Sequence, residues 1–375
     1  MPTLRVLHLL GAGEDTGGIL TTLRNLQTAT AARGVEHVLW VNQAYREVRQ
    51  PRLNYRYSRH LVQDCDNHFE LAFRALRALP ELRALRRAEP FDVLHAHTRG
   101  SFVLAVLLTR LSRRRLVYTN HGFATRRGMY RWGAASPRLV TCVLTPNMAR
   151  YYELDTAAPN IRVISECCAD DLFERPTVPG GFDPARPVRL AGLGNIVAWK
   201  NWHLILEAVA HLADADRRRL EFHHWGPVPN DPECRAYQQQ LEALRERHRL
   251  RASCWFHGLS LAVEERLRTA DWFVLPSRNE PCSLALIEAL ALGLPALVSG
   301  SGGNVDIVRP EQTGLLFESE NVASLTDGLR RIARGETQLL PPAAIRESVR
   351  SRSATIVAGQ YLELYRTLLP SGGAH

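Results

Sequence analysis

Lysine is almost absent from this chain of 375 residues. One lysine, Lys200, stands beside 46 arginines (47 basic residues less that one), and the net charge is +9. With so much alanine and leucine, this usage indicates codon bias, and no interleaved aromatic and basic pattern of the kind that binds single strands occurs. We therefore expect no nucleic-acid partner. A basic protein is still attracted to anionic partners such as phosphates, sugar nucleotides or an acidic membrane surface.

Paired cysteines and long apolar runs are also missing. The seven cysteines form no CxxC pair, which argues against a disulfide scaffold and a zinc site and predicts buried, reduced thiols. No apolar run approaches the roughly 20 residues that span a bilayer. The short run over residues 6–10 with one early arginine is too little for a secretion signal, so the expected compartment is the cytoplasm. A hydrophobic content of 45% with 23% charged residues excludes disorder as the main state.

Strand-like and helix-like segments alternate along the first half of the chain. The length exceeds the usual size of one domain, so we expect two. A buried strand runs into a glycine-rich turn, and the alternation that follows predicts a parallel sheet with helices on both faces. The expected strands are 4–10, 37–41, 93–95 and 116–119, and the expected helices are 18–32, 69–88 and 102–111.

Residues 171–187 are predicted to link the two domains, because four prolines and two glycines fall within residues 173–187. After them the alternation starts again. Two α/β domains joined by a hinge are expected to hold a ligand in the cleft between them. The expected strands are 188–192, 220–224, 272–275 and 296–299, and the expected helices are 202–212, 232–249, 262–269, 283–292 and 354–369.

Two glutamates, Glu280 and Glu288, flank the start of the helix expected over residues 283–292. The N-terminus of a helix offers free N–H groups and a positive dipole end, which suits a diphosphate. The two residues lie roughly 12 Å apart at most at the helical rise. One carboxylate could accept hydrogen bonds from sugar hydroxyls and the other from ribose hydroxyls. Taken alone, each is more often an ordinary carboxylate, a loop residue for Glu280 and a solvated helix residue for Glu288. This interpretation weakens for Glu288, which lies among apolar residues, where a charge needs a partner.

The segment around these glutamates resembles the family 4 glycosyltransferases, which are retaining enzymes with two Rossmann-like domains facing each other across a cleft, the GT-B fold. The resemblance implies transfer of a sugar from a nucleotide-diphosphate donor to a hydroxyl acceptor, in the synthesis of envelope glycans, polysaccharides or glycolipids. The matching positions are Pro276-Ser277, Glu280, Glu288, Ala291-Leu292-Gly293-Leu294-Pro295, Gly302-Gly303 and Thr313-Gly314-Leu315-Leu316.

Three further segments are similar to the same family. Gly17-Gly18 resembles the glycine pair that lets the backbone approach the donor phosphate. His121, in Thr119-Asn120-His121-Gly122, corresponds to the histidine that faces the transferred sugar. Lys200 corresponds to the lysine that contacts the donor phosphates, where a cation stabilises the leaving diphosphate.

Other positions depart from the family pattern or carry a structural interpretation. His95 and His97, on the strand that carries the family's HxH, are expected to be packed residues. Asn195 stands where the family usually has arginine, so one phosphate-facing cation is missing or comes from elsewhere. Residues 165–168 replace the expected Pro-Asn-Gly turn, and Pro-Cys-Ser follows Glu280 where Gly-Phe-Gly is common.

The resemblance thus implies a site and a division into domains. The implied domains are an acceptor domain (1–170), the linker (171–187), a donor domain (188–353) and a terminal helix segment (354–375) that returns to the first domain. The implied partners are a UDP-, GDP- or ADP-sugar and a glycan, lipid-linked or small-molecule acceptor, with peripheral membrane contact also considered. The implied catalytic residues are Glu280, Lys200 and His121, and the donor-binding residues are Gly17, Gly18, Asn195, Ser283, Leu284, Glu288 and Gly303.

No metal ion and no cofactor besides the donor is expected. Asp-x-Asp triplets occur at residues 64–66 and 214–216, in contexts that favour chance. Two alternatives stay open: another enzyme, such as a GT-B sugar-nucleotide epimerase or a dinucleotide oxidoreductase, and a non-catalytic nucleotide-binding relative. The strand over residues 37–41 lacks the terminal acid that an oxidoreductase needs, whereas Asn195 is the feature that favours a non-catalytic relative. Arg83, Arg86 and Arg87 fit either a solvated helix face or an anionic, lipid-linked acceptor.

Overall fold

The computed structural model describes residues 3–11, 13, 17–62, 67–111 and 115–369. The chain divides into two compact units, unit 1 (Met1–Ala169 with Arg352–His375) and unit 2 (Asp170–Ser351). Residues 171–187, which the proline content predicted as a linker, fall within unit 2. Their beginning forms part of a short 3-10 helix, Asp170–Phe173.

Unit 1 is built on a seven-stranded parallel sheet with the strand order β3-β2-β1-β4-β5-β6-β7. Its central strands are almost wholly buried, as expected for parallel strands covered on both faces. The strands are β1 (Leu4–Leu9), β2 (Val35–Asn42), β3 (Asn54–Ser58), β4 (Val93–Ala96), β5 (Leu116–Asn120), β6 (Leu139–Val143) and β7 (Ile161–Val163).

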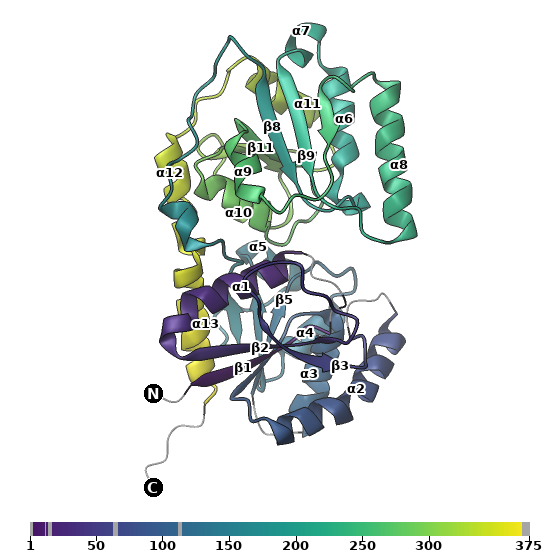
Figure 1. The fold of residues 1–375 in the computed structure, drawn as a ribbon, viewed down its shortest axis with the longest axis vertical. Helices are drawn as coiled ribbons and strands as arrows, with labels where there is room; N and C mark the ends of the chain where they lie inside the picture. The colour runs from purple at the N-terminus through teal and green to yellow at the C-terminus, as the bar shows by residue number, and fades with distance from the viewer. Residues whose placement is uncertain (1–2, 12, 14–16, 63–66, 112–114, 370–375) are drawn as a thin grey trace. The chain divides into compact units, whose positions relative to one another are not determined.

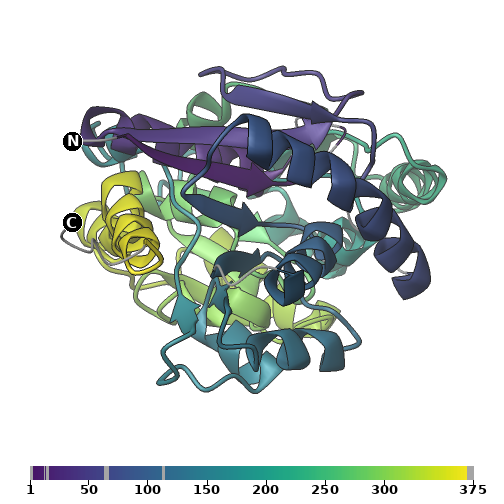
Figure 2. The same cartoon turned by 90° about the horizontal axis from the view of Figure 1, so that it is seen from below.

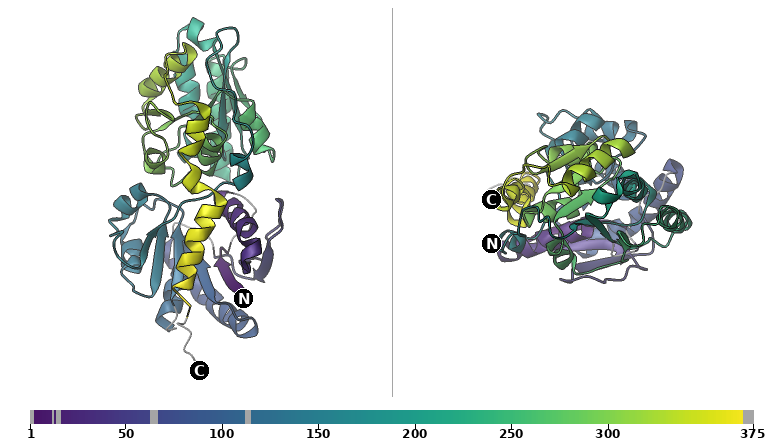
Figure 3. Two further views of the ribbon diagram at one scale, coloured as in Figure 1. Left: turned by 90° about the vertical axis from the view of Figure 1, so that its left-hand side faces the viewer. Right: turned by 90° about the horizontal axis from the view of Figure 1, so that it is seen from above.

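Two pairs of helices pack against each other in unit 1. Helix α1 (Gly18–Thr30) contacts α13 (Ala354–Arg366), and α2 (His68–Ala88) contacts α3 (Arg99–Leu111). The yellow α13 lies beside the purple α1 in Figures 1 and 3, and on a different side of the unit from the blue α2 in Figures 1 and 2. The last described helix therefore belongs to the same unit as the first strand. Two shorter helices, α4 (Gly128–Ala134) and α5 (Pro146–Tyr152), complete this unit.

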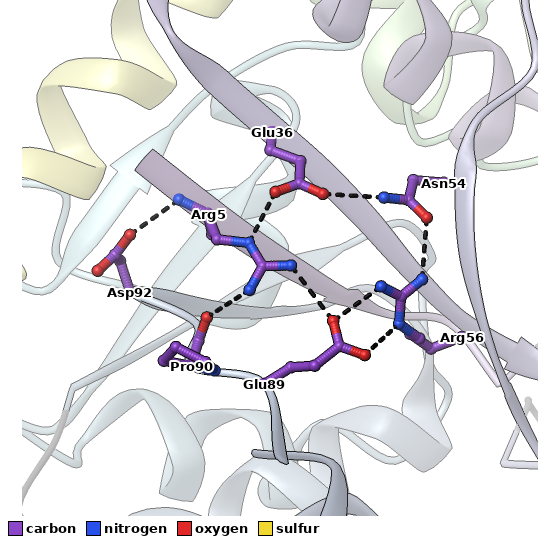
Figure 4. A network of polar contacts seen from close by, with 7 residues as sticks. All are labelled: Arg5, Glu36, Asn54, Arg56, Glu89, Pro90 and Asp92. Carbon is purple, nitrogen blue, oxygen red and sulfur yellow. Dashed lines mark hydrogen bonds and ion pairs between the residues drawn. The ribbon is translucent and has the colours of Figure 1, made fainter. Parts of the chain in front are cut away.

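A network of charged side chains joins the strands at one border of unit 1 (Figure 4). Arg5 Nε donates to Glu36 Oε2 at 2.7 Å, and Arg5 Nη2 donates to Glu89 Oε2 at 3.2 Å. Arg56 holds both oxygens of Glu89, at 2.6 and 2.7 Å. These hydrogen bonds, Arg56 first, lower the pKa of Glu89. The network ties β1, β2 and β3 to the end of α2.

Unit 2 is built on a six-stranded parallel sheet with the strand order β10-β9-β8-β11-β12-β13. Helix α6 packs on both α8 and α11, and α10 on α12. The strands are β8 (Val188–Leu193), β9 (Leu220–Trp225), β10 (Cys254–Phe256), β11 (Trp272–Leu275), β12 (Ala296–Ser299) and β13 (Gly314–Phe317). The helices are α6 (Trp202–His211), α7 (Asp214–Arg217), α8 (Pro232–Arg247), α9 (Val263–Arg268), α10 (Leu284–Ala291), α11 (Val322–Ala333) and α12 (Pro342–Glu347).

Two parallel-sheet α/β domains confirm the predicted fold class. Strands β11 and β12 have the predicted bounds, and most of the other elements that were predicted end within a few residues of their predicted bounds. Some helix ends were wrong. The first helix ends at Thr30, where a 3-10 turn follows, and the last ends at Arg366 instead of residue 369.

Candidate active site

Three loops of unit 2 meet at the carboxyl edge of its sheet, because β8, β11 and β12 are parallel neighbours. The backbone N–H of Arg278, after β11, donates to the carbonyl of Trp199, after β8, at 2.9 Å. The N–H of Gly303, after β12, donates to the carbonyl of Glu280 at 2.6 Å. The sheet order thus brings residues about 80 and 100 positions apart in sequence into one cluster, the loop cluster.

Lys200 projects into the loop cluster from a single 3-10 turn, Ala198–Lys200. Asn201 follows in the left-handed conformation at φ 55°, and α6 begins at Trp202. The ammonium nitrogen lies 2.5 Å from Glu280 Oε2 and 4.6 Å from the centroid of the Trp199 ring. Lys200 is only 9% exposed, so the single lysine of the chain is a buried, paired cation.

Glu280 is held by the backbone of the neighbouring glycine loop. Gly302 has φ +60°, and a β-carbon placed there would lie 2.4 Å from the Glu280 carbonyl oxygen. This close approach requires glycine and lets the next residue, Gly303, donate its N–H to the same carbonyl. Glu280 is 6% exposed, which contradicts the interpretation as an ordinary loop carboxylate. Burying two opposite charges is favourable only with close pairing, which Lys200 and Glu280 provide.

Helix α10 begins one residue later than the sequence predicted. Ser283 is its N-cap, and the serine hydroxyl accepts from the N–H of Leu286 at 3.3 Å. Ser283 was predicted inside the first turn, but its extended backbone (φ −76°, ψ 112°) places it before the helix. Leu284 is the first helical residue, and Glu288 lies half-buried in the second turn. The first-turn N–H groups therefore start at Leu284, directly after the loop that carries Glu280.

Asn195 lies beside the loop cluster, and it stabilises the loop after β8 through its backbone carbonyl. Its carbonyl accepts from the Trp202 indole at 3.1 Å, which fastens the loop to α6. The preceding residue, Gly194, approaches the next strand so closely that a β-carbon on Gly226 would lie 1.8 Å from the Gly194 carbonyl oxygen. That same carbonyl is 3.0 Å from the Nε2 atom of His224. Burial, with a contribution from the charge of Lys200, lowers the pKa of His224 to about 3, so this ring is neutral.

Three predicted site residues belong to unit 1. Gly17 is the N-cap of α1 with φ 90°, and Gly18 is the first residue of that helix. His121 follows β5, and both of its ring nitrogens have partners. Its Nδ1 lies 2.8 Å from Glu166 Oε1, and its Nε2 lies 3.1 Å from His97 Nδ1. Unit 2 therefore brings together Lys200 and Glu280, whereas the glycine pair and His121 are parts of unit 1.

His95 and His97 are buried and hydrogen-bonded, as expected of packed residues. In the second Asp-x-Asp triplet, Asp214 pairs with Arg217 and Asp216 with Arg334, whereas the first, at 64–66, lies outside the described residues. Among the described residues the cysteines are free thiols, and all but the half-buried Cys234 are buried.

Sequence reasoning missed the chain of hydrogen-bonded side chains that leads to His121. Glu166 appeared only as part of a departure from the family's turn, and His8 and His37 appeared only as residues of buried strands. The available signal was the charge itself, because a glutamate within the largely apolar stretch of residues 161–168 needs a partner when that stretch is buried. The sequence separation of 45 residues between Glu166 and His121 concealed which partner it has.

Two family models match the chain, one in each unit. "Glycosyltransferase Family 4" matches residues 16–168, and "Glycosyl transferases group 1" matches residues 184–350. The chain belongs to this family of glycosyltransferases, and it is an enzyme that transfers a sugar from a nucleotide donor.

Individual relatives agree with this assignment. The UDP-Gal:alpha-D-GlcNAc-diphosphoundecaprenol alpha-1,3-galactosyltransferase of Escherichia coli is 25% identical over 291 residues, which are 68% of this chain and 70% of the relative. A glycogen synthase of Rhodopirellula baltica is 33% identical over 160 residues, but these are only 40% of this chain and 30% of that protein. The fold is similar to that of the solved structure of sucrose-phosphate synthase from Thermosynechococcus elongatus, with a TM-score of 0.78 at 20% sequence identity. The matched region covers 97% of this chain and 99% of the synthase chain.

Within the part of the chain that the structure describes, no helix combines the length and the apolar character needed to cross a membrane.

Proposed function

We propose that the enzyme is a retaining hexosyltransferase that uses a UDP-sugar and acts on a lipid-linked or glycan acceptor in envelope glycan or polysaccharide synthesis. The observation that carries the proposal is the buried Lys200–Glu280 pair at the carboxyl edge of the unit 2 sheet. The choice of a UDP-sugar rests on the Escherichia coli relative, whose name includes UDP-Gal and a diphosphoundecaprenol acceptor.

In this proposal the Lys200–Glu280 pair is exchanged for contacts with the donor. The ammonium group of Lys200 would bind the diphosphate, whose negative charge increases as the glycosidic bond breaks. Glu280 would then accept hydrogen bonds from sugar hydroxyls, because a carboxylate is a strong acceptor. The N–H groups that start at Leu284 would add donors to the diphosphate, and Glu288 would accept from the ribose. Because both side chains already lie at the carboxyl edge of the sheet, this exchange would need only a change of side-chain partners and no rearrangement of the two loops.

The proposal needs no protein base and no metal ion. A donor phosphate oxygen would take the proton of the acceptor hydroxyl as that hydroxyl attacks the face from which the diphosphate leaves. Asn195 cannot supply the charge of the usual arginine, so Lys200 would be the main phosphate-facing cation of unit 2. Within unit 2, Gly303 would allow close backbone approach to the donor. The same role for Gly17 and Gly18 of unit 1 is the one that the family resemblance implies.

A comparison of Glu280→Gln with the wild type tests the catalytic part of the proposal. We expect the substitution to lower sugar transfer from UDP-hexose by about 100-fold, an effect of about 3 kcal/mol on the barrier. Glu311→Gln is a matched control, because Glu311 is paired with Arg331 on the surface of the same unit. Equal turnover of Glu280→Gln and wild type would refute the role of Glu280. Inversion at C2 or C4 of the hexose, without transfer, would instead identify an epimerase.

The donor base and the stereochemistry can be measured separately. In thermal-shift measurements with UDP-, GDP- and ADP-sugars, we expect the largest stabilisation from UDP-hexose, and a loss of this stabilisation in Lys200→Met. Nuclear magnetic resonance of the product early in the reaction should show an anomeric configuration equal to that of the donor. Stabilisation by UDP-hexose without any transfer or hydrolysis would favour a non-catalytic relative.

We also propose that the enzyme works in the cytoplasm and touches an anionic membrane surface through α2. Phe69, Phe73 and Leu76 are 90%, 58% and 54% exposed, and they recur at the spacing of one helix face. Arg77 stacks on the Phe73 ring at 5.6 Å and adds positive charge to this stripe. Exposed apolar side chains beside arginine suit the interface of an acidic membrane, which is where a lipid-linked acceptor is found.

Flotation with lipid vesicles tests this surface. We expect the wild type to float with vesicles that contain anionic phosphatidylglycerol, and the double variant Phe69→Ser/Phe73→Ser to remain in solution. Trp132→Ser removes a side chain that is 53% exposed on α4 and serves as the control. Equal flotation of the double variant and the wild type would contradict the proposed contact.

A further inference from the structure

Four histidines of unit 1 form a continuous hydrogen-bonded row across one face of the sheet. His37 Nδ1 lies 2.9 Å from His8 Nε2, and His8 Nδ1 lies 2.9 Å from His97 Nε2. His97 Nδ1 lies 3.1 Å from Nε2 of His121, whose Nδ1 lies 2.8 Å from Glu166 Oε1. We call these four rings the histidine row. It runs from β2 through β1 and the end of β4 to the end of β5.

The histidine row is closed by a threonine at each end, both from α1. Thr22 donates its hydroxyl hydrogen to Glu166 Oε2, so each carboxylate oxygen lies within hydrogen-bond distance of a partner, Thr22 or His121. At the other end, Thr30 Oγ1 lies 3.0 Å from His37 Nε2 and 2.8 Å from the carbonyl oxygen of Leu26. Thr30 has one hydroxyl hydrogen and can donate it to only one of these two acceptors.

With all four rings neutral, hydrogen-bond chemistry allows two complete orders of donors along the histidine row. A neutral imidazole donates from one nitrogen and accepts at the other, so the state of one ring determines the next. In the first order every ring carries its hydrogen on Nδ1 and donates toward Glu166, and Thr30 donates to His37. In the second order every ring carries its hydrogen on Nε2, and Thr30 donates to Leu26. The second order leaves His121 Nδ1 without a hydrogen facing Glu166, which as a carboxylate can only accept.

We infer that Glu166 is a positioning residue of the transfer site, which fixes the Nδ1–H form of His121 and, through His121, of His97, His8 and His37. The ring of His121 is thereby held at both nitrogens, one by Glu166 and one by His97. His121 can then meet a sugar only with its carbon edge or ring face, as a rigid wall. This differs from the catalytic role that the family resemblance implied for it.

A metal site is the competing explanation, and the geometry does not favour it. His8, His95 and His97 form the one group of potential ligands, among the residues that the structure describes, with atoms close enough to hold an ion. All six of their ring nitrogens have hydrogen-bond partners, since His95 is bound by Tyr365 at 2.8 Å and Thr119 at 2.7 Å. The rings of His95 and His97 also overlap at 4.0 Å between centroids instead of converging on a point.

The hydrogen positions can be read from long-range proton–nitrogen correlation spectra of protein labelled with nitrogen-15 histidine. We expect Nδ1–H signals for all four rings of the histidine row, although free histidine favours Nε2–H. In Glu166→Leu we expect His37, at the far end of the row, to change to Nε2–H, because both orders then keep every remaining link of the row and free histidine favours Nε2–H. Tyr365→Phe, which removes a buried hydroxyl from His95 outside the row, should leave the four signals unchanged.

A second variant keeps the test decisive if Glu166→Leu does not fold. Thr30→Val removes the hydroxyl at the far end while Glu166 stays, so all four rings should keep Nδ1–H. Nε2–H signals in the wild type, an unchanged His37 in folded Glu166→Leu, or a changed His121 in Thr30→Val would each overturn the inference. One equivalent of bound zinc, measured by mass spectrometry of the purified protein, would also overturn it.

The kinetic consequence rests on the proposed function, whereas the spectra do not. We expect Glu166→Leu to lower kcat at least about tenfold, because His121 loses one of the two hydrogen bonds that hold its ring in position. Tyr365→Phe leaves both of these hydrogen bonds in place and should retain kcat close to that of the wild type. Absent transfer with the expected spectra would refute the proposed function alone. Full activity of Glu166→Leu with a changed His37 would refute the positioning role and leave the hydrogen order intact.

Discussion

Mild acid should destabilise unit 1 much more than unit 2. Burial lowers the pKa of His37 to about 4 and the pKa values of His8, His95 and His97 well below the usual 6.5, so all four rings are neutral in the folded protein. In the unfolded chain they titrate near 6.5 and bind protons that the folded unit excludes. The free energy of unfolding therefore falls as the pH drops below about 6.5 and keeps falling until the folded pKa values are reached.

The magnitude follows from the number of buried rings. At about pH 5.5, one unit below the unfolded pKa, each excluded proton lowers the free energy of unfolding by between 1 and 2 kcal/mol. Four rings lower it by roughly 6 kcal/mol, a large share of the 5–15 kcal/mol that is usual for a domain. In unit 2 the fully buried His224 predicts a loss of about 1 to 2 kcal/mol. Burial also lowers the pKa values of the partly buried His203, His223 and His257, and each of them adds a smaller loss, so the total for unit 2 stays below that of unit 1.

Hydrogen exchange with mass spectrometry can measure the two units in one sample. Peptides from β1 and β4 report on unit 1, and peptides from β11 and β12 report on unit 2. After correction for intrinsic exchange rates, lowering the pH from about 7.5 to about 5.5 should reduce protection mainly in β1 and β4. Equal loss in both units, or unchanged protection of unit 1, would refute the reasoning.

Three further substitutions test the loop cluster and the border of unit 1. Gly302→Ala should weaken donor binding at least about tenfold because its β-carbon collides with Glu280, whereas Gly258→Ala, also at positive φ but in open space, should bind normally by titration calorimetry. Lys200→Arg should lower kcat at least about tenfold, since a planar guanidinium does not replace a buried ammonium, and wild-type kcat would contradict this. Glu89→Gln should lower the free energy of urea unfolding by about 1 kcal/mol at neutral pH. This difference should disappear below the carboxyl pKa, and its persistence in acid would exclude the ion pairs as the cause.

The fold was predictable where hydrophobic periodicity was strong. Strands β11 and β12 have the predicted bounds because each is an apolar run closed by a turn. The sequence analysis did not propose β3 or β7, whose partly exposed residues give no continuous apolar run. It also missed β6 (Leu139–Val143), although its residues are buried, because no clear helix follows it and α5 spans only 7 residues.

The candidate site was predictable in its residue types but not in its contacts. Lys200 and Glu280 could be named from the sequence, but their direct pairing depends on β8 and β11 being neighbours, which periodicity does not determine. The histidine row was hidden for the same reason. Its members come from four strands or strand ends, and a histidine in a buried strand gives no local signal of its partner.

The buried position of Lys200 also has a practical consequence for labelling. Because the chain has no other lysine, an amine-reactive reagent has one side-chain target, and that target is paired with Glu280. Isotopic methylation of amines would therefore label one side chain, besides the α-amino group of the chain. The methyl signal of Lys200 would serve as a single side-chain probe of whether the donor has entered.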